Sequence, residues 1–351
     1  MSGRLVVVVG GQFGSEGKGA AAGHLATKLF DPVVIRTGGP NAGHTAYDHR
    51  GQQFKLRQLP TAAVTNPQAR LAISAGSLVD LEVLEQEIQL TGRKVWVDQA
   101  ATILEPRHVK QEQTDPDLQW GSTCKGIGAA RADRIHRTAL TWGDHCLTIG
   151  RWVGAAGTDV AALARDKLRA GKDVLIEAAQ GYGLGLHTPY YPKTTSADCR
   201  AIDALADVGL SPWEFSIPPE VWVVVRPYPI RVAGDSGPLL EETSWEELGL
   251  PQERTTVTNK VRRVGLWDDG LVTAAIAANG GKYCRIWLSM ADQVVPEIAG
   301  MTEYTQLESL PFRAWQNLQL WLDRVGSCGA PIGAIGTGPA TAVVIPPAAR
   351  Q

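Results

Sequence analysis

The sequence predicts an α/β fold with a mostly parallel central sheet flanked by helices, and three observations support this prediction. Short runs of apolar, mainly β-branched residues recur along the chain, as expected for strands that are buried on both faces. Amphipathic helical patterns lie between several of these runs, and this alternation is typical of parallel sheets. Glycine-rich loops directly follow two of the runs, at the position where such sheets bind ligands.

The expected elements follow from these patterns. Two helices are predicted most clearly, one over Leu78–Thr91 between a Ser77 cap and Gly92, and the other over Asp159–Ala170. A further helix is expected from Glu16 to about Phe30. The apolar runs predict strands at residues 5–9, 32–36, 71–74, 94–97, 173–177, 221–225 and 285–290.

Length and composition favour an enzyme that acts on small molecules. We expect one domain over residues 1–351, in which the turn-rich, charged segment 105–155 is an inserted excursion from the sheet. The net charge of −2 provides no basic field for nucleic acid or an anionic membrane. The five cysteines are widely spaced without a C-x-x-C pair, which argues against a zinc site and for reduced thiols. No apolar run reaches the roughly 18 residues of a membrane span, so a cytoplasmic location is expected.

The first glycine loop is GGQFGSEGKG, residues 10–19, between a strand and a helix. Backbone amides and the helix dipole gather a phosphate at such a junction, and Lys18 would add a cation. The usual P-loop spacing is not met, because Gln12 stands where a glycine is needed and Gly19 where serine or threonine is needed. We predict a P-loop-like phosphate site; the alternative is a glycine-rich turn without a ligand.

The second glycine loop, RTGGPNAGHT at residues 36–45, follows the next predicted strand. On neighbouring parallel strands the two loops would open at the same edge of the sheet. His44, between Gly43 and Thr45, is therefore a candidate proton donor to an oxygen under attack. The alternative is a histidine that only stabilises the turn by hydrogen bonding.

Further motifs combine glycines, hydroxyls and basic residues, which suit phosphates and carboxylates. The cluster of Lys260, Arg262 and Arg263 is by itself equally typical of a solvated surface. In their order, and together with the two loops, these motifs resemble the adenylosuccinate synthetase family over about Val6–Pro339. They are GSTCKGIG (121–128), EAAQG (177–181), YYPKTTSA (190–197), TTVTNKVRRVG (255–265) and GTGP (336–339).

The resemblance implies a ligase that forms a C–N bond between L-aspartate and C6 of a purine nucleotide. The 6-oxygen is a poor leaving group, so a nucleoside triphosphate first phosphorylates it and the amine then displaces the phosphate. This chemistry requires an in-line γ-phosphate and Mg²⁺ to neutralise the phosphates. The resemblance also implies a homodimer, in which Arg137 reaches the substrate phosphate in the site of the partner chain.

The resemblance carries roles to individual positions. It implies catalysis by Ser15, Lys18 and His44, and a Mg²⁺ site at Ser15 and the Gly43 carbonyl. The implied triphosphate positions are Gly14, Ser15, Glu16, Gly17, Lys18, Gly19, Gly43, His44, Thr45, Arg262, Asp292, Gly336, Thr337 and Gly338. Those for the purine nucleotide are Ser15, Asn41, Ser122, Thr123, Arg137, Gln180, Thr195 and Lys260. Those for aspartate are Val257, Thr258, Asn259, Lys260 and Arg262.

Ser15 departs from the family, where an aspartate acts as general base on purine N1 and helps to bind Mg²⁺. A serine hydroxyl cannot accept that proton at neutral pH without an activating partner. It does leave room for an amino group at C2, beside N1, and can accept a hydrogen bond from it. Guanine has this group, so we expect a guanine nucleotide as acceptor. The sequence resembles the phage branch of the family, which makes N6-succino-2-amino-2′-deoxyadenylate, and this resemblance implies dGMP. The candidates for removing the N1 proton are a water on Ser15, Glu16 or the triphosphate.

Two other departures concern the co-substrates. Within LSMAD, residues 288–292, Met290 stands where the family has a lysine that grips the guanine of GTP, while Asp292 is kept. A thioether packs on a base with little hydrogen-bond specificity, so ATP or dATP is expected as donor; alternatively, Met290 is a core residue and GTP still binds. Lys260 replaces a family arginine in the aspartate loop. The rival functions are ordinary synthesis from IMP and GTP, and an inactive nucleotide-binding paralogue.

Overall fold

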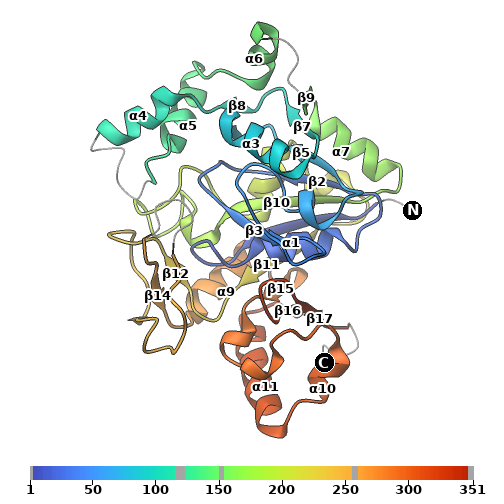
Figure 1. Ribbon diagram of the computed structural model, residues 1–351, viewed down its shortest axis with the longest axis vertical. Coiled ribbons are helices and arrows are strands. Elements are labelled where there is room, and N and C mark those ends of the chain that lie inside the picture. The colour runs from blue at the N-terminus through green and yellow to red at the C-terminus, as the bar shows by residue number, and fades with distance from the viewer. Residues whose placement is uncertain (1–2, 116–122, 150–153, 255–259, 347–351) are drawn as a thin grey trace.

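The computed structural model describes residues 3–115, 123–149, 154–254 and 260–346, and these residues surround a ten-stranded sheet (Figure 1). Neighbouring strands are parallel except for the antiparallel pair β16 and β17, so the predicted fold class is confirmed. In spatial order the strands are β17 (Ala342–Val344), β16 (Ile332–Gly336), β15 (Arg285–Leu288), β11 (Glu220–Val225), β1 (Leu5–Gly10), β10 (Val174–Gly181), β2 (Val33–Arg36), β5 (Arg70–Ile73), β7 (Val95–Asp98) and β9 (Ala155–Thr158).

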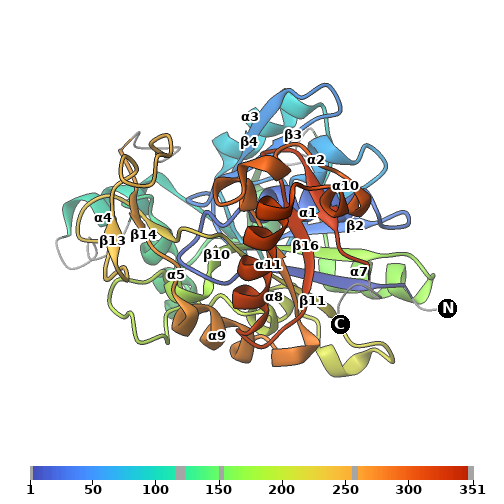
Figure 2. The same cartoon turned by 90° about the horizontal axis from the view of Figure 1, so that it is seen from below.

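Helices cover both faces of the sheet, which explains the continuous apolar strands. Val7 and Val9 of β1 pack in one core with α7, α8, α9 and α11, while Val6 and Val8 pack in the other with α1, α2, α3 and α6. Figure 2 shows α1, α2 and α3 on one side of the strands and α8 and α9 on the other. The bounds are α1 (Lys18–Ala26), α2 (Ala62–Thr65), α3 (Leu81–Thr91), α6 (Trp142–Ile149), α7 (Val160–Arg169), α8 (Ala201–Val208), α9 (Asp269–Ala278) and α11 (Phe312–Gly326).

Smaller elements surround this framework. No described helix combines the length and the apolar character needed to cross a membrane. The small sheets are β3 (His44–Tyr47) with β4 (Gln53–Leu56), β6 (Leu78–Val79) with β8 (Thr102–Ile103), and β12 (Ile230–Arg231), β14 (Arg263–Gly265) and β13 (Glu242–Thr243) in that order. The short turns are η2 (Tyr182–Leu184), η3 (Pro212–Glu214), η4 (Gly281–Tyr283), η5 (Ala291–Gln293) and η6 (Pro296–Ile298), and α10 is Tyr304–Glu308.

The helix predicted to begin at Leu78 begins instead at Leu81. The reason is that Leu78 lies in strand β6, which pairs with β8. Asp80, and not Ser77, caps the helix, because its carboxylate accepts a hydrogen bond from a backbone N–H of the first turn. Gly92 ends the helix as predicted, with a left-handed φ of 64°.

The two other predicted helices are present but shorter. Asp159 is the N-cap of α7 rather than its first residue, and Ala170 is its C-cap. Helix α1 begins after Gly17, whose φ of 92° is left-handed, and ends at Ala26, four residues before Phe30. These differences lie at the ends, where capping geometry sets the bounds.

The segment 105–155 leaves the sheet as expected, but its described part is more helical than the composition indicated. It holds α4 (Pro106–Thr114) and α5 (Ile127–His136), which lie together at the upper left of Figure 1, and α6, which lies at the top of the view. Buried Glu112 of α4 accepts backbone N–H groups of Gly126 and Gly128 at 2.7 and 2.6 Å, so a side chain of the protein caps the start of α5.

The two glycine loops do not follow neighbouring strands, which corrects the sequence-based expectation. Strand β10 lies between β1 and β2 and pairs in parallel with both. Its register places Glu177 opposite Val8 on one side and Arg36 on the other. The carboxyl end of β10, with the EAAQG motif, therefore lies between the two loops at one edge of the sheet.

Candidate active site

The first glycine loop folds back on its own carboxylate. Glu16 is fully buried, and its Oε1 accepts backbone N–H groups of Gln12 and Gly14 at 3.0 and 2.8 Å. Its Oε2 lies 2.6 Å from Nζ of Lys18, which is also buried. Both oxygens are thus engaged within the loop, and this argues against Glu16 as the proton acceptor for the purine.

Close backbone contacts fix the loop against the rest of the site. A Cβ on Gly19 would lie 2.8 Å from His44 Cβ and 2.9 Å from the Thr45 oxygen. This contact explains why the position lacks the serine or threonine of a usual P-loop. Gly14 and Ser15 have left-handed φ values of 87° and 58°, and the second is uncommon for a residue with a side chain. The left-handed turn leaves Ser15 exposed at the tip of the loop.

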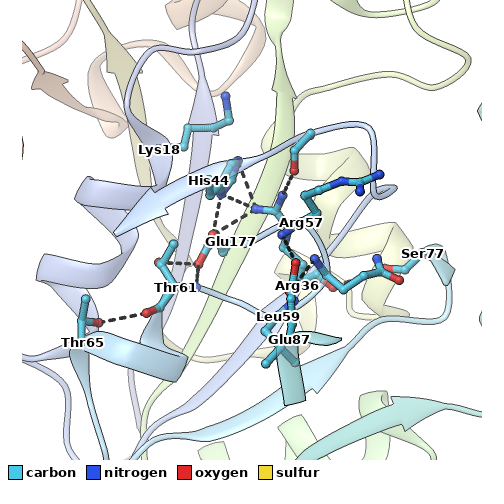
Figure 3. A network of polar contacts seen from close by, with 12 residues as sticks. Lys18, Arg36, His44, Arg57, Leu59, Thr61, Thr65, Ser77, Glu87 and Glu177 are labelled. Carbon is cyan, nitrogen blue, oxygen red and sulfur yellow. Dashed lines mark hydrogen bonds and ion pairs between the residues drawn. The ribbon is translucent and has the colours of Figure 1, made fainter. Parts of the chain in front are cut away.

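A buried network holds His44 from the neighbouring strands (Figure 3). Glu177 Oε1 lies 2.5 Å from His44 Nδ1 and 3.0 Å from Arg36 Nη1. Glu177 Oε2 accepts the backbone N–H and the hydroxyl of Thr61, both at 2.8 Å. Arg36 Nη1 also lies 3.0 Å from His44 Nε2, and its Nη2 donates to the Ala42 carbonyl at 2.8 Å. The network thus fixes the orientation of the imidazole.

The network also sets the protonation of the histidine. Burial, followed by the positive charge of Arg36, lowers the pKa of His44 to about 3, although Glu177 opposes this shift. Burial by itself would raise the pKa of Glu177, but the hydrogen bond and charge of His44, and then Arg36, lower it overall. His44 is therefore neutral, with Nδ1–H donating to Glu177. A phosphoryl anion beside the ring would raise its pKa and is needed before it can act as an acid.

Three members of this network were not among the predicted site residues: Arg36, Thr61 and Glu177. A sequence signal did exist, because Arg36 and Glu177 are charged residues in otherwise apolar strand patterns. Such residues are almost never fully buried unless they are paired. Thr61 gives no comparable signal, since a threonine before a short helix is ordinary.

Ser15 meets a basic residue from the other end of the chain. Arg262 Nη1 donates a hydrogen bond to Ser15 Oγ. Buried Arg226 donates to the Ser15 carbonyl at 3.3 Å and forms a two-pronged ion pair with Glu253, at 3.0 and 2.5 Å. Burial lowers the pKa of Arg262, and Glu253 opposes this. Because the partner of the Ser15 hydroxyl is a donor, it does not convert the hydroxyl into a base.

Met290 lies beside the first glycine loop, the predicted phosphate loop at residues 10–19, and is not a core residue. It is half-buried and has a left-handed φ of 55° at the end of β15. A Cβ on Gly17 would lie 3.3 Å from Ser289 Cβ and 3.8 Å from Met290 Cε. Gly336 also lies close to Ser289, since a Cβ on Gly336 would lie 3.0 Å from Ser289 Cα. The predicted triphosphate positions at the ends of β1, β15 and β16 thus come together.

The remaining triphosphate positions surround this contact. Asp292 is half-buried in η5, and burial raises the pKa of its carboxyl group. Thr337 is buried, and its hydroxyl donates to the Met301 carbonyl at 2.6 Å. A Cβ on Gly338 would lie 2.9 Å from Thr341 Oγ1, so this glycine also serves a close approach.

A separate cavity lies between the carboxyl ends of β2 and β10 and helices α5 and α8. Asn41, Gln180 and Thr195 line it, so three predicted purine-nucleotide positions come together. Arg131 and Asp207, which were not predicted, line the same cavity. Burial raises the pKa of Asp207 to about 6, although the charge of Arg131 opposes this.

Other predicted positions lie elsewhere. Thr123, Arg137 and Lys260 are exposed and are not among the residues that line this cavity. Arg137 is the C-cap of α5, with a left-handed φ of 65°. The calls on Ser122, Val257, Thr258 and Asn259 lie outside the described residues.

The predicted Mg²⁺ site fits the structure only in part. Among the described residues no three histidine, cysteine or acidic side chains are grouped to hold a metal ion. Mg²⁺ at nucleotide sites takes most of its ligands from phosphates and water, so such a group is not required. The exposed Gly43 before β3 agrees with a carbonyl ligand. Ser15 fits less well, because the Arg262 guanidinium already donates to its hydroxyl and repels a cation.

Comparisons with known proteins agree with the motifs. A family model described as Adenylosuccinate synthetase matches residues 7–149 and 144–317. The adenylosuccinate synthetase of Pyrococcus sp. (strain ST700) is 36% identical over 345 residues, covering 95% of this chain and 96% of that protein. That of Methanococcus maripaludis (strain C6) is 38% identical over 312 residues, covering 86% and 88%.

Two solved structures are similar in fold. One is the succinoaminodeoxyadenylate synthetase of cyanophage S-2L bound to dGMP and to dATP as an energy donor, with a TM-score of 0.83, 28% identity and coverage of 100% of this chain and 97% of that one. The other is the fully ligated adenylosuccinate synthetase of Plasmodium falciparum, with a TM-score of 0.80 and coverage of 98% and 100%; its 20% identity bears on the fold alone. The chain belongs to the adenylosuccinate synthetase family, whose members are ligases that form a carbon–nitrogen bond.

Proposed function

We propose that the chain joins L-aspartate to C6 of dGMP, with ATP or dATP as the energy donor. The products are (2S)-2-amino-2′-deoxyadenylosuccinate, ADP or dADP, and phosphate, for the synthesis of 2-aminoadenine DNA precursors. The observation that carries this proposal is the exposed hydroxyl of Ser15 at the tip of the phosphate loop. The cyanophage S-2L synthetase, bound to dGMP and dATP, supports it by its similarity over the whole chain.

The contacts of Ser15 agree with a 2-amino group beside it. A hydroxyl oxygen has two lone pairs, and Arg262 uses one of them. The second can accept a hydrogen bond from the 2-amino group of guanine. An aspartate at this position would form an ion pair with Arg262 and fill the space that the amino group needs. IMP has no group at C2 that would use this acceptor.

The reaction then proceeds in two displacements. The purine O6 attacks the γ-phosphorus and the nucleoside diphosphate leaves; the aspartate amine next attacks C6, and the C6–O bond breaks as phosphate departs. Lys18 would exchange Glu16 for the phosphates, and His44 would stabilise the charge on O6 once the phosphoryl group has raised its pKa. Mg²⁺ would neutralise phosphate charge, with the Gly43 carbonyl as a protein ligand. Glu16 is fully buried and its Oε1 stays bound to the Gln12 and Gly14 amides, so we favour a Ser15-bound water or the triphosphate as acceptor of the N1 proton.

The choice of donor rests on Met290. Its methyl group lies over Gly17, where the chain turns into α1. A thioether packs against a base without demanding a particular edge, so an adenine nucleotide is accepted there. The exposed position of Arg137 at the end of α5 agrees with a contact to the site of a second copy, so the proposal includes a homodimer.

Phosphate release separates this function from ordinary adenylosuccinate synthesis, which the names of the curated relatives favour. The purified chain is assayed with dGMP or IMP, with ATP, dATP or GTP, and with or without aspartate. We expect aspartate-dependent release that is fastest with dGMP and an adenine nucleotide. Equal or faster turnover of IMP would contradict the proposal. An inactive paralogue would be stabilised by nucleotides without any turnover. The His44–Glu177 network of this chain argues against that alternative.

A further inference from the structure

The cavity between the carboxyl ends of β2 and β10 and helices α5 and α8 is lined by a cation, Arg131, that the family resemblance does not assign. We infer that Arg131 binds the 5′-phosphate of the acceptor nucleotide and determines that the substrate is a nucleotide rather than a nucleoside. The inference rests on the proposed function, in that the acceptor must occupy this cavity. It adds a positive charge from the same chain to the one that Arg137 would supply from a second copy.

The position of Arg131 supports this role. It lies on the second turn of α5 and lines the cavity together with Asn41 and Thr195. Its Nε is buried and has no hydrogen-bond partner among the described residues, and the same is true of Asn41 Oδ1. Buried polar atoms are nearly always paired in folded proteins. The Arg131 Nε–H needs an acceptor, which a phosphate oxygen supplies, whereas Asn41 Oδ1 is itself an acceptor and needs a donor from another part of the ligand.

The charges around the cavity make Arg131 the cation available to an anion. Arg200 also lines the cavity, but its guanidinium donates to Asp203 at 2.8 and 3.0 Å. None of the ion pairs between described residues includes Arg131. Its charge acts on Asp207, which lines the same cavity.

Arg131 lies within α5 and Arg137 is the C-cap of this helix, but the two side chains would bind phosphate in different sites. Six residues separate them, which corresponds to about 9 Å along an α-helix. Arg131 faces the cavity of its own chain, whereas Arg137 lies exposed beyond the last turn. An arginine suits a phosphate particularly well, because its planar guanidinium donates two parallel hydrogen bonds.

The test compares a nucleotide with its nucleoside. Binding of dGMP and of 2′-deoxyguanosine is measured by calorimetry for the wild-type chain and for Arg131→Gln. We expect the substitution to raise the Kd of dGMP about 10- to 100-fold, since a charge-assisted contact to the phosphate is lost. The Kd of deoxyguanosine should change less than about twofold, because it has no phosphate. Arg134→Gln removes the same charge from an exposed site on the same helix and should leave both constants unchanged.

Two outcomes would overturn the inference: an unchanged Kd for dGMP, or an equal loss for nucleotide and nucleoside. If Arg131→Gln does not fold, Arg131→Met keeps the apolar stem and is measured in its place, with the same expected difference. IMP and inosine form a second pair of ligands. If the chain prefers IMP, the proposed dGMP specificity fails, while the difference between nucleotide and nucleoside still tests Arg131.

Discussion

The buried centre around His44 and the exposed rim of the site differ in how their charges are paired. In the centre, Arg36, His44 and Glu177 are buried and in contact with one another, and Thr61 satisfies the remaining carboxylate oxygen. At the rim, Arg262 donates to a neutral hydroxyl, and Arg131 Nε has no hydrogen-bond partner in the described part of the chain. A buried charge loses its hydration and must be paired for the chain to fold. A charge at the rim is solvated by water and can stay without a protein partner until a ligand binds. The centre is thus held mainly by contacts within the chain, with Arg36 Nε as its buried atom that has no partner among the described residues. We expect substrate choice to depend on the rim.

The largest effect should come from breaking the paired centre. Glu177→Gln leaves Arg36 buried without its counter-ion, so we expect a loss of about 3–5 kcal/mol in the free energy of unfolding. Denaturant unfolding followed by circular dichroism measures this loss. The control is Asp166→Asn, which removes the exposed partner of Arg169 and should cost less than about 1 kcal/mol. Similar losses for the two variants would contradict the comparison.

A smaller effect concerns the pH dependence of stability. The pKa of His44 in the folded chain, about 3, lies below the ordinary value of 6.5, so the unfolded chain binds the extra proton between these values. Stability should therefore fall as pH drops from 6.5 towards 3. Between pH 6.5 and pH 4 we expect roughly 2–3 kcal/mol from this group, since one pKa unit corresponds to about 1.36 kcal/mol.

Unfolding of His44→Asn and of wild type at several pH values isolates this contribution. The variant should be less sensitive to acid than wild type, whatever its stability at neutral pH. His49→Asn, which removes an exposed histidine, should follow the wild-type curve. A His44→Asn curve parallel to that of wild type would show that the histidine is not held neutral by its surroundings.

The smallest effect on stability, with the clearest effect on substrate choice, is expected at the rim. Ser15→Asp should change the free energy of unfolding by less than about 0.5 kcal/mol, because the residue is exposed. It should lower kcat/KM for dGMP about tenfold or more and raise the ratio of IMP to dGMP turnover. Ser15→Ala keeps the space and removes only the acceptor, so it should cost less. Unchanged dGMP turnover in Ser15→Asp would show that the residue does not face C2.

The fold was predictable where local patterns determine it. The apolar strands and the Gly92 helix end follow from side-chain character and backbone geometry. The position of β10 between β1 and β2 did not follow, because strand order depends on pairing between distant segments. For the same reason Leu78 was placed in a helix, although it pairs with Thr102 in a short parallel ladder.

The site shows the same division. The glycine loops were recognisable from composition and order, and the structure brings Gly17, Met290 and Gly336 together. The hydrogen-bond partners of individual side chains could not be recognised from the sequence, because they come from distant parts of the chain. Arg262, for example, is 247 residues from Ser15. Glu177 was visible in a quoted motif, but its role depends on the register that sets it opposite Arg36.

The carboxylate of Glu16 fixes the shape of the phosphate loop from within. Because it holds the Gln12 and Gly14 amides and the Lys18 ammonium, we expect a triphosphate to meet a preformed loop. Binding should then need little ordering of the loop, and the main local change we expect is the transfer of the Lys18 ammonium group from a carboxylate to a phosphate. The association rate of the nucleotide should accordingly be limited by diffusional encounter rather than by folding of the loop. Glu16 would thus keep the loop in the conformation that binds the anionic phosphates.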